Sequence, residues 1–215
     1  GDKVPFESIK NVFPNKETII AGIDVSVFLY QSIKTAVGAA QFHAVPNMPV
    51  TAIVNRLSAL VKLLEIHNIT GVFVFDGEKH ERKKVSDIRA TTVENAIKKM
   101  KAIQKCVVEE NGGVATESQY KQYQAAAKQA AKPRLFDIAY AINYLKEAGK
   151  TVIVGAYEAD FQLVQLYTTG EIDFIISVDL DYFIYDCILM ADLSINTGKC
   201  VILHRENMDE YWKQL

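Results

Sequence analysis

Six acidic residues of the 215-residue chain follow apolar runs at four separate places. Runs of this kind, short and rich in β-branched residues, are typical of buried strands. The acids and the runs before them are Asp24 after 18–23, Asp76 after 71–75, Glu158 and Asp160 after 151–154, and Asp179 and Asp181 after 172–177. Charged groups that repeatedly follow buried strands suggest one shared site.

The elements between these strands indicate how the acids are brought together. Apolar residues recur at helical spacing in four stretches, which are 27–40, 51–67, 135–148 and about 159–167. Ser26 is a candidate N-cap for the first of them. Strands that alternate with helices predict an α/β fold, with a central, mostly parallel, Rossmann-like sheet and helices on both faces. Beyond Asp181, apolar runs at 188–190 and 201–203 predict two more strands joined by a turn at 196–198.

The carboxyl ends of parallel strands share one edge of a sheet, where ligands of such folds bind. An isolated acid there would be a helix cap or a loop acid. Six together would repel one another, so the cluster requires cations. Ligation by oxygen alone favours Mg²⁺ or Mn²⁺ over Zn²⁺. The ExD and DxD spacings suit two ions, and two such ions support in-line displacement at a phosphodiester.

A basic insertion separates the second and third predicted strands. Residues 78–134 hold 13 Lys or Arg against 7 Asp or Glu, whereas the remainder holds 11 against 19. Helical patterns over 81–110 and 119–132 are divided by Asn111-Gly112-Gly113. The second pattern lacks a broad apolar face, so we expect the insertion to stand away from the domain and to be mobile or ordered by a partner. The positive charge indicates either a phosphate-bearing partner or a solvated face.

Other chemistries fit the sequence less well. It contains neither GxxxxGK[ST] nor GxGxxG, and its four histidines are scattered without an accompanying nucleophile. The segment IDVSV resembles the start of a haloacid-dehalogenase-type phosphatase, but Ser26 stands where that motif has its second aspartate. The three cysteines form no CxxC pair, so we interpret them as free thiols. No apolar run reaches about 18 residues and no signal peptide is evident, so we expect no membrane partner and an intracellular protein, nuclear or cytoplasmic.

Four segments, in order, resemble a known family. GIDVSVFLYQS, VFVFDGEKHERKK, GAYEADFQLVQL and ISVDLDYFIYD are similar to the N and I regions of the flap endonuclease/XPG-type 5′ nucleases. The resemblance extends over about 18–205 and implies a PIN-like fold. It implies that Asp24, Asp76, Glu158 and Asp160 hold one metal ion and that Asp179 and Asp181 hold the second.

The resemblance also gives the insertion a role. Residues 79–134 would form a helical arch that passes single-stranded 5′ ends, and Lys83 and Arg89 would contact the scissile phosphate. Further cations expected to bind nucleic acid are Lys79, Arg82, Lys84, Lys121, Lys128, Lys132 and Arg134.

The chain departs from the family pattern in three places. Its start, GDKVPFESI, does not match the family's Met-Gly start, and Val178 stands where relatives often carry an acid. It also stops before the family's seventh aspartate and the helix-two-turn-helix that grips duplex. A protein partner could act through that missing C-terminal region.

We therefore expect a single PIN-like nuclease domain over 1–215. It would be a divalent-metal-dependent 5′ nuclease, an exonuclease or a structure-specific endonuclease, that cleaves DNA or RNA of single-stranded or 5′ flap character. The alternative is a catalytically weak or inactive nuclease-like domain that serves as a nucleic-acid-binding or protein-interaction scaffold. A phosphatase is the least favoured hypothesis.

Overall fold

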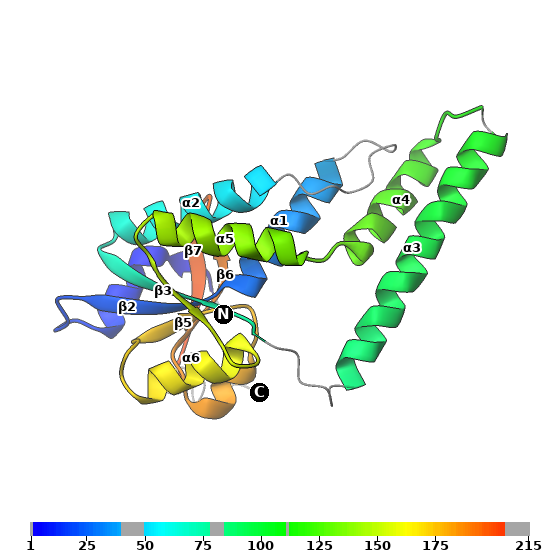
Figure 1. The fold of residues 1–215 in the computed structure, drawn as a ribbon. Coiled ribbons are helices and arrows are strands. Elements are labelled where there is room, and N and C mark those ends of the chain that lie inside the picture. The colour runs from blue at the N-terminus through cyan, green and yellow to red at the C-terminus, as the bar shows by residue number, and fades with distance from the viewer. Residues whose placement is uncertain (1, 40–49, 78–83, 111, 205–215) are drawn as a thin grey trace, which may run out of the picture. The chain divides into compact units, whose positions relative to one another are not determined.

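The computed structural model describes residues 2–39, 50–77, 84–110 and 112–204, without the side chains of 37–39, 84–89, 110 and 183. The chain divides into two compact units (Figure 1). The sheet unit comprises Gly1–Phe28, Asn55–Lys79 and Ala141–Leu215, and the helical unit comprises Leu29–Val54 and His80–Tyr140. Three helices continue from one unit into the other, namely α1 (Val25–Ala39), α2 (Val50–Ile66) and α5 (Leu135–Glu147).

The sheet unit contains a seven-stranded sheet in the order β1-β7-β6-β5-β2-β3-β4. The five strands from β6 to β4 are parallel to one another, whereas β7 is antiparallel to both β6 and β1. The strands are β1 (Val4–Pro5), β2 (Ile19–Asp24), β3 (Ile69–Phe75), β4 (Thr151–Val154), β5 (Phe174–Ile176), β6 (Leu189–Ser194) and β7 (Lys199–Leu203). The predicted α/β class with a mostly parallel sheet is confirmed.

Helices cover both faces of this sheet. On one face, Leu163 and Leu166 of α6 (Ala159–Thr168) belong to a buried cluster with Ile175 of β5 and Tyr182 of the 3₁₀ helix η2 (Asp181–Tyr185). On the other face, α2 packs so closely that a Cβ atom added to Gly71 of β3 would lie 3.0 Å from the Cδ1 atom of Leu64. Burial of these apolar side chains on both faces holds the carboxyl ends of the strands in fixed register.

Most predicted element bounds agree with the structure to within about two residues. The larger differences are β6, predicted to end at 190 but ending at Ser194, and α3, predicted from 81 but described from Lys84. The other differences are local. The expected N-cap role of Ser26 is wrong, because α1 begins at Val25 and the Oδ1 atom of Asp24 accepts the Ser26 N–H at 3.1 Å. Neither β1 nor the 3₁₀ helix η1 (Phe6–Val12) was foreseen, since the two residues of β1 are too few to form a pattern and are strand only through pairing with β7.

The helical unit is built on α3 (Lys84–Glu110) and α4 (Glu117–Ala130), which lie side by side (Figure 1). A capping box starts α4, in which the Thr116 hydroxyl accepts the Gln119 N–H and the Gln119 side chain accepts the Thr116 N–H. The side chains buried in the two helices are Ala96, Met100 and Val107 in α3 and Tyr123, Ala126 and Ala127 in α4. The expectation that the insertion stands away from the domain and is mobile or ordered by a partner stays a prediction.

The structure also bears on the cysteines and on membrane-spanning helices. None of the three cysteines forms a disulfide, and burial raises the pKa values of the Cys187 and Cys200 thiols to about 11. Within the described residues, no helix combines the length and the apolar character needed to span a bilayer.

Candidate active site

All six predicted acids lie in the sheet unit, at or just past the carboxyl ends of parallel strands. Asp24 is the last residue of β2 and Asp76 follows β3. Glu158 directly precedes α6 and Asp160 lies in its first turn, while Asp179 follows β5 and Asp181 opens η2. Because these strands are parallel, their carboxyl ends lie at one edge of the sheet, and acids that are far apart in the sequence are brought to that edge.

Asp24 is the most deeply placed of these acids, with only 6% of its surface exposed. Its Oδ2 atom accepts a hydrogen bond from the Ser177 hydroxyl at 3.0 Å, while Oδ1 accepts the Ser26 N–H. Burial raises the pKa of this carboxyl to about 7, and the nearby charges of Asp160 and Asp76 act in the same direction. Near neutral pH, Asp24 is thus poised between its neutral and charged forms.

Asp76 joins the end of β3 to two helices. Its Oδ2 atom accepts the Ser26 hydroxyl at 2.6 Å, and its Oδ1 atom accepts the N–H of Ala159, the first residue of α6, at 2.9 Å. This carboxylate therefore satisfies one of the N–H groups that a helix start leaves without an intrahelical partner.

The backbone beside Asp76 is tightly packed. Gly77 donates its N–H to the Tyr157 carbonyl at 2.5 Å, and Gly155 donates to the Phe75 carbonyl at 2.9 Å. A Cβ atom at Gly77 would lie 1.8 Å from the Gly155 oxygen, so only glycine fits there. This close crossing brings Asp76 to the start of α6.

Asp160 is held by a tyrosine. The hydroxyl of Tyr182 donates to its Oδ1 atom at 2.7 Å. Burial is the main cause of the raised pKa of Asp160, and the charges of Asp179, Glu158 and Asp76 raise it further. The pKa of buried Tyr182 is itself raised, chiefly by burial and then by Asp24 and Asp160, so its phenol stays protonated and remains a donor.

The DxD pair lies on a short turn stabilised by its own hydrogen bonds. The Asp179 N–H donates to the Ser177 hydroxyl at 3.2 Å, and the Asp181 N–H donates to the Asp179 Oδ1 atom at 3.0 Å. Ser177 therefore touches both Asp24 and Asp179. The side chain of Asp181 is exposed, and its backbone N–H, bound to Asp179, connects it to the other acids.

The structure thus brings five carboxylates within electrostatic reach of one another, and Asp181 adjoins them. Every side chain in this group offers oxygen ligands. Burial is the main cause of the raised pKa values of Asp24 and Asp160 and neighbouring acids raise them further, and a bound divalent cation would offset both effects. In donor type the site fits Mg²⁺ or Mn²⁺. As the side chains stand, no three Asp, Glu, His or Cys residues in the described segments are arranged to hold one ion together.

Three hydroxyl residues of this site were missed as site residues in the sequence. They are Ser26, Ser177 and Tyr182, and each donates to one of the acids. Ser177 and Tyr182 flank the DxD pair in SVDLDY, so their nearness to the acids was a usable signal. Ser26 was considered only as a cap and as a departure from a phosphatase motif.

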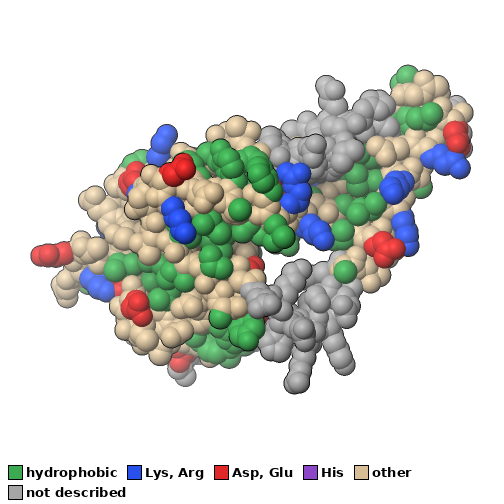
Figure 2. All heavy atoms as spheres, viewed as in Figure 1, with side chains coloured by type: hydrophobic (Ala, Val, Ile, Leu, Met, Phe, Trp, Pro, Cys, Tyr) green, Lys and Arg blue, Asp and Glu red, His purple; other side chains and the backbone are tan. Residues whose placement is uncertain are grey.

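The structure describes the side chains of only some of the cations that were predicted to bind nucleic acid. Lys79, Arg82 and Lys83 lie outside the described residues, and Lys84 and Arg89 lie in α3 without described side chains. In the helical unit, Lys121 pairs with Glu117 at 2.6 Å and Arg134 pairs with Asp137 at 2.8 Å, while Lys128 and Lys132 are exposed. Figure 2 shows Lys and Arg side chains on the visible surface of α3 and α4.

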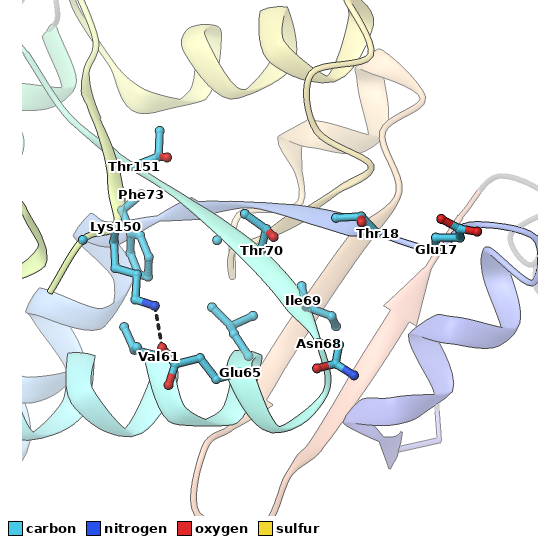
Figure 3. Close-up of a pocket in the computed structure, with 13 residues that line it drawn as sticks. Glu17, Thr18, Val61, Glu65, Asn68, Ile69, Thr70, Phe73, Lys150 and Thr151 are labelled. Carbon is cyan, nitrogen blue, oxygen red and sulfur yellow. Dashed lines mark hydrogen bonds and ion pairs between the residues drawn. The ribbon is translucent and has the colours of Figure 1, made fainter.

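A pocket of about 460 Å³ lies at the opposite edge of the sheet (Figure 3). Its lining includes Thr18, Ile69 and Thr151, which stand at the amino ends of β2, β3 and β4. Its one lysine, Lys150, is paired with Glu65 at 2.5 Å. Because none of the six predicted acids lines this pocket, it is separate from the candidate active site.

The model of the XPG I-region matches residues 149–212, which include Glu158, Asp160, Asp179 and Asp181. No curated protein sequence matches the chain.

Solved structures match nearly the whole chain. The catalytic core of Rad2 in complex with DNA substrate superposes with a TM-score of 0.59 at 18% identity, covering 97% of this chain and 51% of that one. Human GEN1 in complex with Holliday junction DNA gives 0.58 at 12% identity, with 99% and 43% covered. GEN1 with product DNA, Mg²⁺ and Mn²⁺ gives 0.55 at 16% identity, with 98% and 39% covered.

These likenesses concern the fold, since identity is low, and the chain spans about half or less of the length of those proteins. The fold is the PIN-like α/β arrangement of the Rad2 and GEN1 cores, and the I-region lies where the acids of the third and fourth strand ends are found. Residues 149–212 are thus similar to the XPG I-region, and the fold of the chain is similar to that of the Rad2 and GEN1 cores.

Proposed function

We propose that this domain is a divalent-metal-dependent nuclease that hydrolyses phosphodiester bonds of nucleic acid. The observation that carries the proposal is the group of carboxylates at the carboxyl edge of the sheet, in which Asp24 has its pKa raised to about 7. Two lone acids would be explained as helix caps, but five that repel one another require a cation.

In this proposal Asp24, Asp76, Glu158 and Asp160 hold one ion, and Asp179 and Asp181 hold the second. When bound, the ions supply an activated water and offset the charge on the attacking and leaving oxygens. The chain's own residues orient the ligands. Ser26 and the Ala159 N–H fix Asp76, Ser177 fixes Asp24, and Tyr182 fixes Asp160.

The proposed substrate is DNA or RNA with single-stranded or 5′ flap character, cleaved in an exonuclease or endonuclease mode. Rad2 and GEN1, which share the fold, were solved with DNA, and GEN1 also with Mg²⁺ and Mn²⁺. Lys83 and Arg89 are proposed to contact the scissile phosphate. The cations of the insertion would neutralise further phosphates along the strand.

Cleavage of 5′-labelled single-stranded and flap oligonucleotides tests the proposal, with Mg²⁺, with Mn²⁺ and with EDTA. Asp179→Asn should reduce the rate at least about a hundredfold, because it removes charge from the second ion's ligands. The matched control is Asp192→Asn, which changes an exposed aspartate paired with Lys3 in the β6–β7 region. Cleavage that persists in EDTA, or equally in Asp179→Asn, would rule out the metal mechanism.

One observation favours the alternative of a binding scaffold. The carboxylates as placed do not present three ligands to one ion within the described residues, and hydroxyl groups occupy several of their oxygens. If the protein binds oligonucleotides but cleaves none with either metal ion, the scaffold is the correct function and hydrolysis is excluded.

A further inference from the structure

The first two turns of α5 expose apolar side chains to solvent. Leu135 is 86% exposed, Phe136 63% and Tyr140 45%. Further along the same helix, Ala141 and Leu145 are fully buried. The exposed residues therefore form a separate surface at the start of the helix, within the helical unit.

Two of these residues form an aromatic pair. Phe136 and Tyr140 are four positions apart, so they lie on the same side of the helix. Their ring centroids are 6.3 Å apart and the ring planes are inclined by 40°. A paired, exposed aromatic surface offers π-faces to a flat ligand.

The backbone beneath this pair is held rigidly. Asp137 is buried, and it accepts hydrogen bonds from the Arg134 N–H at 3.0 Å, from Nε at 2.8 Å and from Nη2 at 2.9 Å. The Arg134 hydrogen bonds lower the pKa of Asp137, so the carboxylate stays charged near neutral pH. The start of α5 is thereby fixed before any ligand arrives, which reduces the entropy lost on binding.

Two exposed lysines shortly precede the aromatic pair in the sequence. Lys128 lies in the last turn of α4 and Lys132 in the short link to α5, and both are exposed. In the described part of the chain neither lysine forms an ion pair, whereas the charge of Arg134 is offset by Asp137. Two exposed lysines that shortly precede two exposed aromatic rings in the sequence combine a phosphate-attracting charge with a stacking surface.

We propose that Phe136, Tyr140, Lys128 and Lys132 form a stacking platform for single-stranded nucleic acid. Bases would stack on the two rings, and the neighbouring phosphates would lie near the lysines. Single strands fit this surface because bases inside a duplex keep their faces covered. The platform rests on the proposed function for its ligand class, but it uses none of the carboxylates.

Fluorescence anisotropy in EDTA, where no hydrolysis occurs, measures this binding. The probes are labelled oligo-dT, oligo-rU and a blunt DNA duplex of the same length. The double variant Phe136→Leu/Tyr140→Leu keeps the apolar surface but removes the aromatic faces. It should weaken binding of both single strands about tenfold or more and leave duplex affinity within about twofold.

A second variant separates charge from stacking. Lys128→Gln/Lys132→Gln should weaken binding of single strands and duplex alike. It should also reduce the slope of log K against log salt by about 0.7 per lysine for single strands. Ile66→Ala, which changes an exposed apolar residue of α2 in the sheet unit, is the control and should alter neither affinity.

If the leucine variant folds poorly, a tryptophan substitution tests the platform instead. Phe136→Trp should retain single-strand affinity, and its added fluorescence should be quenched on binding, measured against wild type with its single Trp212. Unchanged single-strand affinity of the leucine variant would overturn the platform and assign the surface to a protein partner. If the leucine variant instead lost duplex and single-strand affinity equally, the platform would be overturned too. Binding without cleavage would refute only the nuclease proposal, and cleavage with unaltered binding would refute only the platform.

Discussion

Hydroxyl groups hold the acids at the sheet edge, and this is the decisive feature at the residue scale. Ser26 and Ser177 donate to Asp76 and Asp24, and Tyr182 donates to Asp160. The positions of the acids could be predicted, because each follows an apolar run. Their hydroxyl partners could not, because they depend on strand register: Ile23 pairs with Ile176, which sets Ser177 beside Asp24.

Removing the Tyr182 hydroxyl isolates one of these contacts. Tyr182→Phe keeps the ring in its buried place but leaves Asp160 without that donor, so the free energy of unfolding should fall by about 1 kcal/mol. Urea denaturation in EDTA measures the change. Tyr185→Phe, at an exposed tyrosine of the same 3₁₀ helix, is the control and should be neutral. Equal effects of the two variants would show that the Tyr182–Asp160 bond contributes nothing.

The raised pKa of Asp24 predicts a pH dependence of stability in the metal-free protein. Between its ordinary value near 3.8 and about 7, the folded state binds more protons at this carboxyl than the unfolded state does. The free energy of unfolding should therefore fall as pH rises through this window, by at most about 1.4 kcal/mol for each pH unit.

Asp24→Asn removes the titrating group and tests this dependence. Urea midpoints in EDTA from pH 4.5 to 8.5 should show a shallower decline for the variant than for wild type, and a more stable variant at the alkaline end. Parallel curves for the two proteins would contradict the assignment.

At the scale of elements, the strands and helices that carry the acids were predictable, because burial on both faces imposes apolar patterns. The α3–α4 pairing was not, since the side chains buried in α4 are only Tyr123 and two alanines, too few apolar residues to indicate a packed face. The starts of α1 and α6 are capped by Asp24 and Asp76 from neighbouring strands, so helix position and acid position depend on each other.

Gly77 links these elements. Gly77→Ala places a Cβ atom 1.8 Å from the Gly155 oxygen, so the backbone must shift and Asp76 must move from the start of α6. We expect a loss of about 1–3 kcal/mol in unfolding free energy, measured by urea denaturation. Gly112→Ala is the control, because it meets no atom within 4 Å and introduces only strain at a φ of 59°. A Gly77 variant no less stable than the control would contradict the tight crossing.

At the scale of the whole molecule, the order of strand ends in the sequence predicted the fold class, and the likeness to the Rad2 and GEN1 cores agrees with it. The charge asymmetry was visible in the sequence as well. The division into a sheet unit and a helical unit that also takes in 29–54 was not, because that segment has the same apolar helical pattern as its neighbours.

Divalent-ion binding tests the central claim, that the edge acids form a metal site, most directly. Mn²⁺ titration followed by electron paramagnetic resonance should show up to two bound ions per wild-type chain. The triple variant Asp76→Asn/Asp160→Asn/Asp179→Asn should bind none tightly, while Asp192→Asn should match wild type. Equal Mn²⁺ binding by wild type and the triple variant, or no binding by wild type, would contradict the account.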